Sequence, residues 1–578
     1  MANIKIIIDG KEIETSEGKT VLQAARENGI KIPALCYHPD LKIKSNCRLC
    51  LVEIKGERGM VPSCRVQVKE GMEITTGSEK IDRARKINLE LIFAQHFEEC
   101  GDCNWGSGCR LLGLALKYKV NVRRFLDRKE NGKIYQFGSI VFDQSKCINC
   151  RNCVEVCAEQ KVNFLEPAGK GYKAEIEPSK KEDKDCVSCG QCILRCPVGA
   201  IEAVGEFEGA EKILQEKGKI KVFQFAPSIR SSIGEPFGLP AGSVMTDQLS
   251  AGLRKLGADK VFDVSTAADF TTIEEAGELV EKIKNGTGPC FTSCCPAWVR
   301  YLEFNYPEMI KYFATTRSPQ IISGGLIKTY WASKEEIDPK KISVISVMPC
   351  TSKKIEIQRK EVEINGLRPV DYVMTTRELA YLFKKKGINL KNIEPEPADS
   401  PFGDPSGAGV IYGASGGVVE SALRTAYFKL TGKDLPNVEF EQVRGLQGMK
   451  KAELEIEGKK IKIAVVNGLA NAKIIIEELK KDPHAYDAVE VMACPGGCIG
   501  GGGQPMPVSE EIRKKRAAAL YQIDRDKPVR LAHRNPDVQK VYEEFLKDDK
   551  IRHAVCHTSY GKRSKGEIKI LKNSKETL

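Results

Sequence analysis

Cysteine is the residue type whose spacing points most clearly to chemistry in this sequence. The chain of 578 residues contains 22 cysteines, and most of them stand at short, regular intervals. Disulfides are rare in reducing compartments, so closely spaced thiols there more often bind metal than crosslink the chain. The stretch "FTSCCPAW" even sets two cysteines side by side, Cys294 and Cys295. Adjacent side chains rarely reach one metal, and a disulfide between them would be strained. The second sulfur therefore needs a role of its own.

Two runs of cysteines follow the pattern C-x2-C-x2-C-x3-C, and a proline follows the second run. The runs supply Cys147, Cys150, Cys153 and Cys157, then Cys186, Cys189, Cys192 and Cys196. This doubling resembles bacterial two-cluster ferredoxins, in which the fourth cysteine of each run binds the [4Fe–4S] cluster of the other. A pair of zinc knuckles is the alternative. Ala158 replaces the proline expected after the first run, which implies a mildly changed turn.

Two further sets of possible ligands precede these runs. The first has the thiol count of a [2Fe–2S] cluster: Cys36, Cys47, Cys50 and Cys64. The second is a histidine with three cysteines: His96, Cys100, Cys103 and Cys109. Zinc is the alternative for both sets, and a zinc site with three cysteines and one histidine fits the second equally well by residue type. The adjacent doubled run favours a [4Fe–4S] cluster there.

The elements around the first set predict a small mixed domain. "IKIIIDGKEIE" reads as two strands around an Asp9-Gly10 turn, a strong hairpin signal. "TVLQAARENG" reads as a helix with Thr20 as N-cap, Gln23 closing a capping box and Gly29 at the C-terminal cap. This β-grasp pattern resembles plant-type ferredoxins, although the cysteine gaps differ, and the resemblance favours iron over zinc.

From about residue 209 the pattern becomes α/β. Three apolar strands end at special residues: one at Ala226-Pro227-Ser228, one at Cys350, and one at Cys494 and Cys498. Open α/β sheets place ligand sites at such carboxyl ends. "TTIEEAGELVEKIKN" and "GASGGVVESALRTAYF" predict helices between them. Neither a P-loop nor a properly placed G-x-G-x-x-G occurs, so the glycines are better explained by close backbone approach to a bulky cofactor.

Composition restricts the class of protein. The chain is 41% hydrophobic and 29% charged, which predicts a soluble protein of several domains. The N-terminus lacks the layout of a secretory signal, and no run is apolar for long enough to span a membrane. We therefore expect a cytoplasmic protein. The net charge of +12 comes from dispersed lysines, which favours a solvated surface over nucleic-acid binding.

Three segments in order, "FTSCCPAW", "MPCTSKK" and "MACPGGCIGGGGQP", resemble the signatures of the [FeFe]-hydrogenase catalytic domain. The preceding 210 residues resemble the accessory cluster domains of larger members, and "LAHRNPDVQKVYEEFL" and "HTSYGKR" resemble the small-subunit-like end. The resemblance implies a multidomain α+β and α/β protein. Its expected parts are a β-grasp [2Fe–2S] domain (1–80), a [4Fe–4S] domain with one histidine and three cysteine ligands (81–125), a two-[4Fe–4S] ferredoxin-like domain (126–208), the catalytic domain (209–510) and the small-subunit-like region (511–578).

The resemblance also assigns residues and cofactors. It implies an H-cluster, a [4Fe–4S] cube joined to a diiron unit with CO, cyanide and dithiolate ligands, beside one [2Fe–2S] and three accessory [4Fe–4S] clusters. The cube's thiolates are Cys295, Cys350, Cys494 and Cys498, the last of which bridges to the diiron unit. Lys353 holds a cyanide. The remaining pocket residues are Ala226, Pro227 and Ser228 in a cyanide-contacting loop, with Gln320, Met348 and Met492 in the wall.

A proton carrier is needed beside such a metal site. A thiol, with an ordinary pKa of about 8.5, titrates nearer neutrality than a carboxylic acid, and unlike serine it can yield its proton. Cys294 is the candidate.

Glu275, Glu278 and Lys282 share one helix face and match the family's relay, with lysine in place of its usual arginine. The relay's serine falls at Ala314, beside Thr315, which leaves the middle of the path open. A solvated Glu278–Lys282 pair is the alternative. Cys290 and Cys556 are interpreted as small buried hydrophobic residues.

The expected function is reversible reduction of protons to H2. Electrons would come from ferredoxin or from an NAD(P)H-oxidising flavin subunit, and maturation proteins would supply the diiron unit. One alternative is an electron-transfer subunit, because residues 1–210 also resemble the large iron–sulfur subunit of NADH–quinone oxidoreductase. The other is a non-catalytic relative, such as an iron–sulfur assembly protein or a hydrogen sensor. The presence of Cys294, Lys353 and the four cube thiols favours the enzyme.

Overall fold

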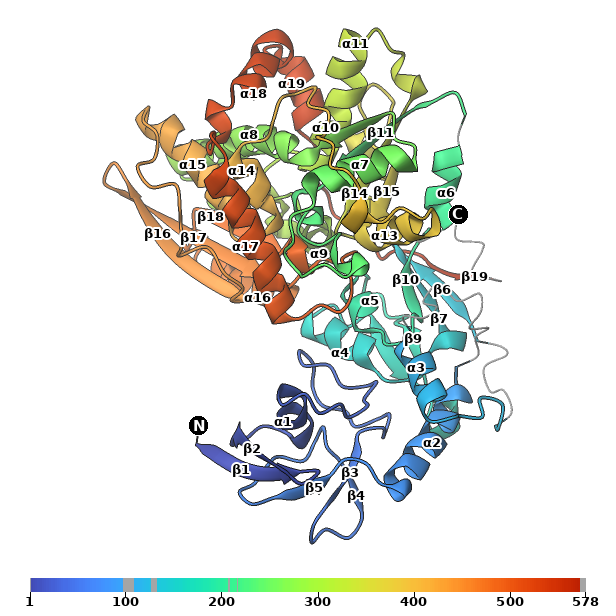
Figure 1. Ribbon diagram of the computed structural model, residues 1–578. Helices are drawn as coiled ribbons and strands as arrows, with labels where there is room; N and C mark the ends of the chain where they lie inside the picture. The colour runs from blue at the N-terminus through green and yellow to red at the C-terminus, as the bar shows by residue number, and fades with distance from the viewer. Residues whose placement is uncertain (1, 97–108, 126–131, 206–207, 216, 572–578) are drawn as a thin grey trace.

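The computed structural model describes residues 2–96, 109–125, 132–205, 208–215 and 217–571 (Figure 1). The N-terminal part is a five-stranded sheet in the order β2-β1-β5-β3-β4. Its strands are β1 (Asn3–Ile8), β2 (Lys11–Ser16), β3 (Leu51–Ile54), β4 (Met60–Pro62) and β5 (Glu73–Thr75). The predicted hairpin is confirmed, because Asp9 and Gly10 join β1 to β2 with positive φ angles of 51° and 78°. Ile6 and Ile8 are fully buried beneath the helix that follows.

Helix α1 (Val21–Glu27) begins as predicted. Thr20 is its N-cap and forms the capping box with Gln23. Asn28 is the C-cap, and Gly29 follows it at a φ of 75°, a conformation that glycine adopts without strain. Two helices, α2 (Glu79–Phe93) and α3 (Arg110–Lys117), then lead into the second part of the chain.

The second part carries both cysteine runs. Helices α4 (Asn152–Glu159) and α5 (Gln191–Arg195) pack together beside the hairpin of β8 (Leu165–Ala168) and β9 (Glu175–Pro178). A sheet in the order β10-β7-β6-β19 covers them, made of β6 (Ile134–Phe137), β7 (Ile140–Asp143), β10 (Ile201–Ala203) and β19 (Ile568–Leu571). Strand β19 comes from the end of the chain and pairs antiparallel with β6, so the C-terminal segment returns to this sheet (Figure 1).

The large α/β part contains two sheets. One is parallel, in the order β12-β11-β14-β15: β11 (Ile220–Phe225), β12 (Lys260–Asp263), β14 (Ile342–Met348) and β15 (Tyr372–Thr375). The other, in the order β13-β18-β17-β16, contains β13 (Cys290–Phe291), β16 (Met449–Ile456), β17 (Lys459–Asn467) and β18 (Ala488–Met492). The three predicted apolar strands are β11, β14 and β18, and all three exist. β11 and β14 belong to one sheet and β18 to the other, so their carboxyl ends meet between two sheets.

Helix α8 (Val264–Asn285) runs past both sheets and starts before the segment that the sequence predicted. Its first two turns are rich in Ala, Ser and Thr, and these small residues let α10 (Pro319–Leu326), α14 (Gly407–Val410) and α15 (Gly417–Thr431) pack closely. The C-terminal helices α18 (Pro536–Val541) and α19 (Asp549–Cys556) also contact α8. Further helices are α6 (Glu208–Gln215), α7 (Thr246–Leu256), α9 (Pro296–Asn305), α11 (Ala332–Lys334), α12 (Lys353–Glu356), α13 (Thr376–Lys385), α16 (Leu469–Lys481) and α17 (Glu510–Asp526).

The described part of the chain contains no helix with the length and apolar character to cross a membrane. Cys290 and Cys556 are buried in hydrophobic clusters.

Candidate functional site

The loops at the ends of β11, β14 and β18 meet the "FTSCCPAW" segment around one cavity. Every pocket residue that the sequence predicted lines it: Ala226, Pro227, Ser228, Cys294, Cys295, Gln320, Met348, Cys350, Lys353, Met492, Cys494 and Cys498. The wall is almost entirely apolar apart from the thiols and Lys353. Segments more than 270 residues apart in the sequence therefore converge on one cavity.

Four thiols of the cavity are held by the ends of secondary-structure elements. Cys295 is the N-cap residue of α9, with Pro296 in the first turn, and Cys350 follows β14. Cys494 comes just after β18, and Cys498 opens a short 3₁₀ helix. Gly497, the residue before Cys498, has a φ of 94°, and a Cβ on this glycine would lie 2.7 Å from the sulfur of Met492. The glycine-rich turn is therefore required to bring Cys498 to the cavity.

The donor set suits an iron–sulfur cluster. Burial raises the pKa of all four thiols, to about 12 for Cys350, and neighbouring thiols add to the rise at Cys350, Cys494 and Cys498. Buried sulfurs that crowd one another in this way are stabilised as thiolates by metal cations, and thiolates select iron–sulfur clusters or other soft metals. Among the described residues, no three His, Cys, Asp or Glu side chains group tightly enough for a single ion. Thiols spread around a large cavity instead suit a cluster with several corners.

Cys294 and Lys353 lie together on the cavity wall. Lys353 Nζ donates to the backbone carbonyl of Cys294 at 3.0 Å and to Glu356 Oε2 at 2.8 Å. Burial alone would lower the pKa of Lys353, but the Glu356 carboxylate outweighs it, so the lysine is a buried cation. Burial raises the pKa of the Cys294 thiol, and Glu275 adds to this effect while Lys353 opposes it.

Behind Cys294 lies Glu275, which is 3% exposed. No described group donates a hydrogen bond of normal geometry to its carboxylate. Burial raises the pKa of Glu275 to about 8, the charge of Glu278 adds to it, and the nearby N–H of Ser293 only partly offsets it. Glu275 is therefore a neutral acid at neutral pH, which is the state that can carry a proton.

The outer relay residues do not form the simple pair that spacing suggested as an alternative. Glu278 accepts hydrogen bonds from the hydroxyls of Thr316 (2.7 Å) and Thr315 (3.1 Å). Lys282 Nζ donates to the backbone carbonyl of Tyr312 at 2.8 Å. No ion pair within the described ranges joins Glu278 to Lys282. Ala314 is fully buried, and the hydroxyls beside it reach Glu278 rather than Glu275.

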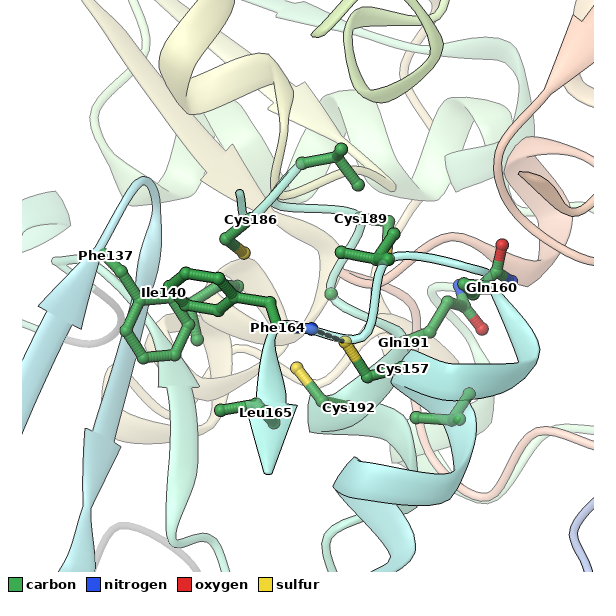
Figure 2. Close-up of a pocket in the computed structure, with 14 residues that line it drawn as sticks. Phe137, Ile140, Cys157, Gln160, Phe164, Leu165, Cys186, Cys189, Gln191 and Cys192 are labelled. Atoms are coloured by element: carbon green, nitrogen blue, oxygen red, sulfur yellow. Dashed lines mark hydrogen bonds between the residues drawn. The ribbon is translucent and has the colours of Figure 1, made fainter. Parts of the chain in front are cut away.

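A second cavity lies among the ferredoxin-type runs. Cys157 of the first run lines it together with Cys186, Cys189 and Cys192 of the second, and Figure 2 shows these thiols around one space beside Phe164. The N–H of Phe164 donates to the Cys157 sulfur at 3.2 Å. The other four thiols of the runs lie near one another. Burial is the main cause of the raised pKa of Cys153, and the nearby thiols of Cys147, Cys150 and Cys196 raise it further. This grouping is the one expected if the fourth cysteines of the two runs are exchanged.

The N-terminal thiols are arranged as two pairs. The N–H of Cys47 donates to the Cys36 sulfur at 3.4 Å, and Cys50 lies beside Cys64 and lowers its pKa. Two pairs suit two irons with two thiolates each. In the next set, His96 Nδ1 lies 2.6 Å from the carbonyl oxygen of Lys146.

A carbonyl can only accept, so Nδ1 of His96 carries the proton and Nε2 is left as a potential metal ligand. Cys109 is the N-cap residue of α3. Cys100 and Cys103 lie outside the described residues.

The second cavity abuts the first. The Cys494 sulfur lies 3.9 Å from the carbonyl oxygen of Cys189, and Gln191 Nε2 donates to the carbonyl of Gly500 at 3.0 Å. A Cβ on Gly502 would lie 2.5 Å from the Cys189 carbonyl oxygen. Glycine at this point therefore lets the two ligand loops touch.

Comparisons with known proteins agree with this arrangement. Residues 219–502 match the family described as iron only hydrogenase large subunit, C-terminal domain, and 510–563 match iron hydrogenase small subunit. Residues 1–79 match a 2Fe-2S iron-sulfur cluster binding domain, and 119–200 match a 4Fe-4S dicluster domain.

Two relatives match almost end to end. A subunit of an NADP-reducing hydrogenase from Solidesulfovibrio fructosivorans is 38% identical over 98% of this chain and 100% of its own length. The chain belongs to the [FeFe]-hydrogenase family. Iron hydrogenase 1 of Clostridium pasteurianum is also 38% identical, over 96% of this chain and all of its own. A solved structure of a variant of the apo [FeFe]-hydrogenase HydA1 of Chlamydomonas reinhardtii matches over 61% of this chain and 98% of its own, with a TM-score of 0.56 and 37% identity.

The chain is thus an [FeFe]-hydrogenase with accessory iron–sulfur domains. Sequence reasoning missed two residues of this hydrogenase's site. Glu356 pairs with Lys353 and accepts a hydrogen bond from Gln320 Nε2 at 2.8 Å. Tyr412 lines the cavity and is hydrogen-bonded through its hydroxyl to Thr272. Glu356 lies three positions after Lys353, a spacing that could have suggested the pair. No local signal marks Tyr412.

Proposed function

We propose that this cavity holds the H-cluster and that protons are reversibly reduced to H2 there. The observation that carries this assignment is the convergence of four buried thiols, a buried lysine and the Ala226–Ser228 loop on one volume. The thiolates of Cys295, Cys350, Cys494 and Cys498 hold the cube. When bound, the cluster supplies the metal site at which two protons and two electrons combine.

The chain's own residues orient the cluster and move protons. Lys353, kept cationic by Glu356, suits an anionic cyanide ligand, as does the loop of Ala226, Pro227 and Ser228. The Cys294 thiol exchanges the proton beside the metal site, and Glu275 receives or supplies it from behind. The apolar wall, including Met348 and Met492, keeps bulk water out.

Electrons enter through a series of accessory clusters. We assign one [2Fe–2S] cluster to Cys36, Cys47, Cys50 and Cys64, and one [4Fe–4S] cluster to His96, Cys100, Cys103 and Cys109. Two more cubes take the exchanged sets of the ferredoxin-type runs. The set that contains Cys189 is adjacent to the cavity, because the Cys189 carbonyl oxygen lies 3.9 Å from the Cys494 sulfur.

The partner at the entry of this series is a ferredoxin or an NAD(P)H-oxidising flavin subunit in the cytoplasm. The name of the Solidesulfovibrio relative, an NADP-reducing hydrogenase subunit, supports the second choice. The sequence has neither a P-loop nor a dinucleotide fingerprint, so the chain requires another subunit for any reaction with NAD(P)H. Maturation proteins supply the diiron unit.

The test is H2 evolution from reduced viologen by protein produced with and without maturation proteins. We expect H2 only from the matured protein, and no NADH-driven H2 from the single chain. Absence of H2 from protein that carries the full diiron unit would contradict the proposal. Robust NADH-driven H2 from the chain alone would contradict the assignment of partners.

A further inference from the structure

Glu278 is connected outward to the C-terminal segment of the chain. The Thr315 hydroxyl, which is on the surface, donates to Glu278 Oε1 at 3.1 Å. The same hydroxyl lies 2.9 Å from Nδ1 of His557, the residue that follows α19. One hydroxyl therefore joins the relay carboxylate to an imidazole more than 240 positions away in the sequence.

His557 lies between two carboxylates of α8. Its Nε2 is 3.1 Å from Glu274 Oε2, and its Nδ1 is 3.6 Å from Glu278 Oε1. Glu274 and Glu278 are one helical turn apart, so the ring spans them. An imidazole can take a proton at one nitrogen and release another from the second nitrogen. The ring is 13% exposed, which places it at the edge of the surface.

The charges around the ring favour a proton on it. Burial alone would lower the pKa of His557, but the hydrogen bonds to Glu274 and Glu278 outweigh burial and raise the pKa to about 9. Exposed His553 stacks on the ring with centroids 5.4 Å apart. The other titratable or charged groups that face this site are Arg317, Lys429, Tyr542, Arg552 and Cys556.

Lys282 is less suitably placed to exchange protons with Glu278. Its Nζ is directed at the backbone carbonyls of Tyr312 and Phe313, at 2.8 and 3.4 Å. Glu278 is instead surrounded by Thr315, Thr316 and His557. The contacts of the carboxylate thus lead toward the C-terminal segment.

We propose that protons pass between Glu278 and the surface through Thr315 and His557, with Glu274 as the outer acceptor. This inference rests on the proposed function. In the outward direction the imidazolium gives its Nε2 proton to Glu274, which releases it to water. The neutral ring then holds its remaining proton on Nδ1, and a shift of that proton to Nε2 frees Nδ1. Nδ1 accepts the proton of the Thr315 hydroxyl while the Thr315 oxygen takes a proton from Glu278, which restores the imidazolium. Only O–H and N–H bonds form and break, and no electron moves. The inward direction is the reverse.

The first test is chemical rescue of a His557→Ala variant in the matured full chain. We expect turnover to fall by about 10²-fold, in the range of a positioned acid–base group, and to recover when imidazole is added. Infrared bands of the diiron carbonyl and cyanide ligands report cofactor loading. The matched control is His533→Ala, because His533 also contacts a threonine, Thr425, and a carboxylate, Asp434, away from Glu278. The control should keep its turnover and should not respond to imidazole.

The second test needs no turnover. Exchange of the imidazole C2 proton, followed by mass spectrometry, gives the pKa of each histidine in the full chain produced without maturation proteins. His557 should titrate above the ordinary value of about 6.5 and move toward it in a Glu274→Gln variant. If His557 had an ordinary pKa that did not change in Glu274→Gln, the contact between His557 and Glu274 would be contradicted.

The outcomes of the rescue test separate this inference from the proposed function. A loaded His557→Ala protein with near wild-type turnover, or one that imidazole does not rescue, would overturn the His557 route alone. A loaded wild-type protein without turnover would overturn the proposed function and this inference with it.

Discussion

Replacing Glu275 with glutamine should make the hydrogenase domain more stable in alkaline solution and far less active. Glu275 is buried without a hydrogen-bond donor of normal geometry among the described residues, beside the charge of Glu278. Glutamine has the same shape but carries no titratable proton. The two effects have opposite signs, and a purely structural glutamate would not produce both of them.

The magnitude follows from the pKa of about 8 that burial gives Glu275. The folded protein holds this proton more tightly than the unfolded chain, in which the group titrates near 4.5. Its contribution to stability is therefore complete below about pH 4.5 and is lost as the pH rises through 8. At about 1.4 kcal/mol per pH unit, the difference between the folded and unfolded pKa values corresponds to an upper bound of about 5 kcal/mol in the free energy of unfolding. Glutamine shows no such loss. Turnover should fall by about 10² to 10⁴, the usual range for an acid–base group.

The assay compares anaerobic guanidinium denaturation of wild type and Glu275→Gln at pH 6 and pH 9, in protein produced without the diiron unit. The denaturation midpoint of wild type should drop between the two pH values by clearly more than that of the variant. H2 turnover is then measured on the matured proteins. If the denaturation midpoints of wild type and Glu275→Gln fell equally between pH 6 and pH 9, Glu275 would not be a buried neutral acid. Unchanged turnover of loaded Glu275→Gln would remove Glu275 from the proton path.

Three further predictions concern thiols and metal content. Cys295→Ser should lose the cofactor, because a hydroxyl is a poor iron ligand. Cys294→Ser should keep the diiron infrared bands but lose about 10²- to 10⁴-fold in turnover. A loaded, fully active Cys294→Ser protein would exclude Cys294 from the proton path. Cys157→Ser should alter the electron paramagnetic resonance of the cluster held by Cys186 and leave that of Cys147 unchanged; the reverse result would refute the exchange of ligands. Matured protein should contain on the order of 20 iron atoms and almost no zinc by elemental analysis, and stoichiometric zinc would overturn the accessory assignments.

Local signals in the sequence predicted much of this molecule. The Asp9-Gly10 turn and the Thr20 capping box act over a few residues, and both form as expected. The doubled cysteine pattern also predicted which thiols lie together, because Cys157 lines a cavity with the first three thiols of the second run and Cys196 lies near those of the first run. Apolar strands that end at Cys350 or Cys494 indicated the ligand loops, since a buried strand has a recognisable pattern.

Contacts between distant segments could not be predicted in this way. The sequence did not indicate that β11 and β18 belong to separate sheets, because both are mostly apolar. Nothing around His557 marks it as a neighbour of Glu278, because their contact depends on how α19 packs against α8. Spacing made Lys282 the natural partner of Glu278, but the fold supplies backbone carbonyls to the lysine and threonine hydroxyls to the carboxylate.

The infrared spectrum of matured protein, compared with a Cys498→Ser variant and recorded before and after exposure to H2, tests whether an H-cluster bound through Cys498 occupies this cavity. We expect carbonyl and cyanide bands that shift reversibly with H2 in the wild type and are lost or strongly reduced in the variant. Bands of equal strength in both proteins would contradict the assignment of Cys498 as the link between cube and diiron unit. A fully matured wild type without such bands would contradict an H-cluster in this cavity.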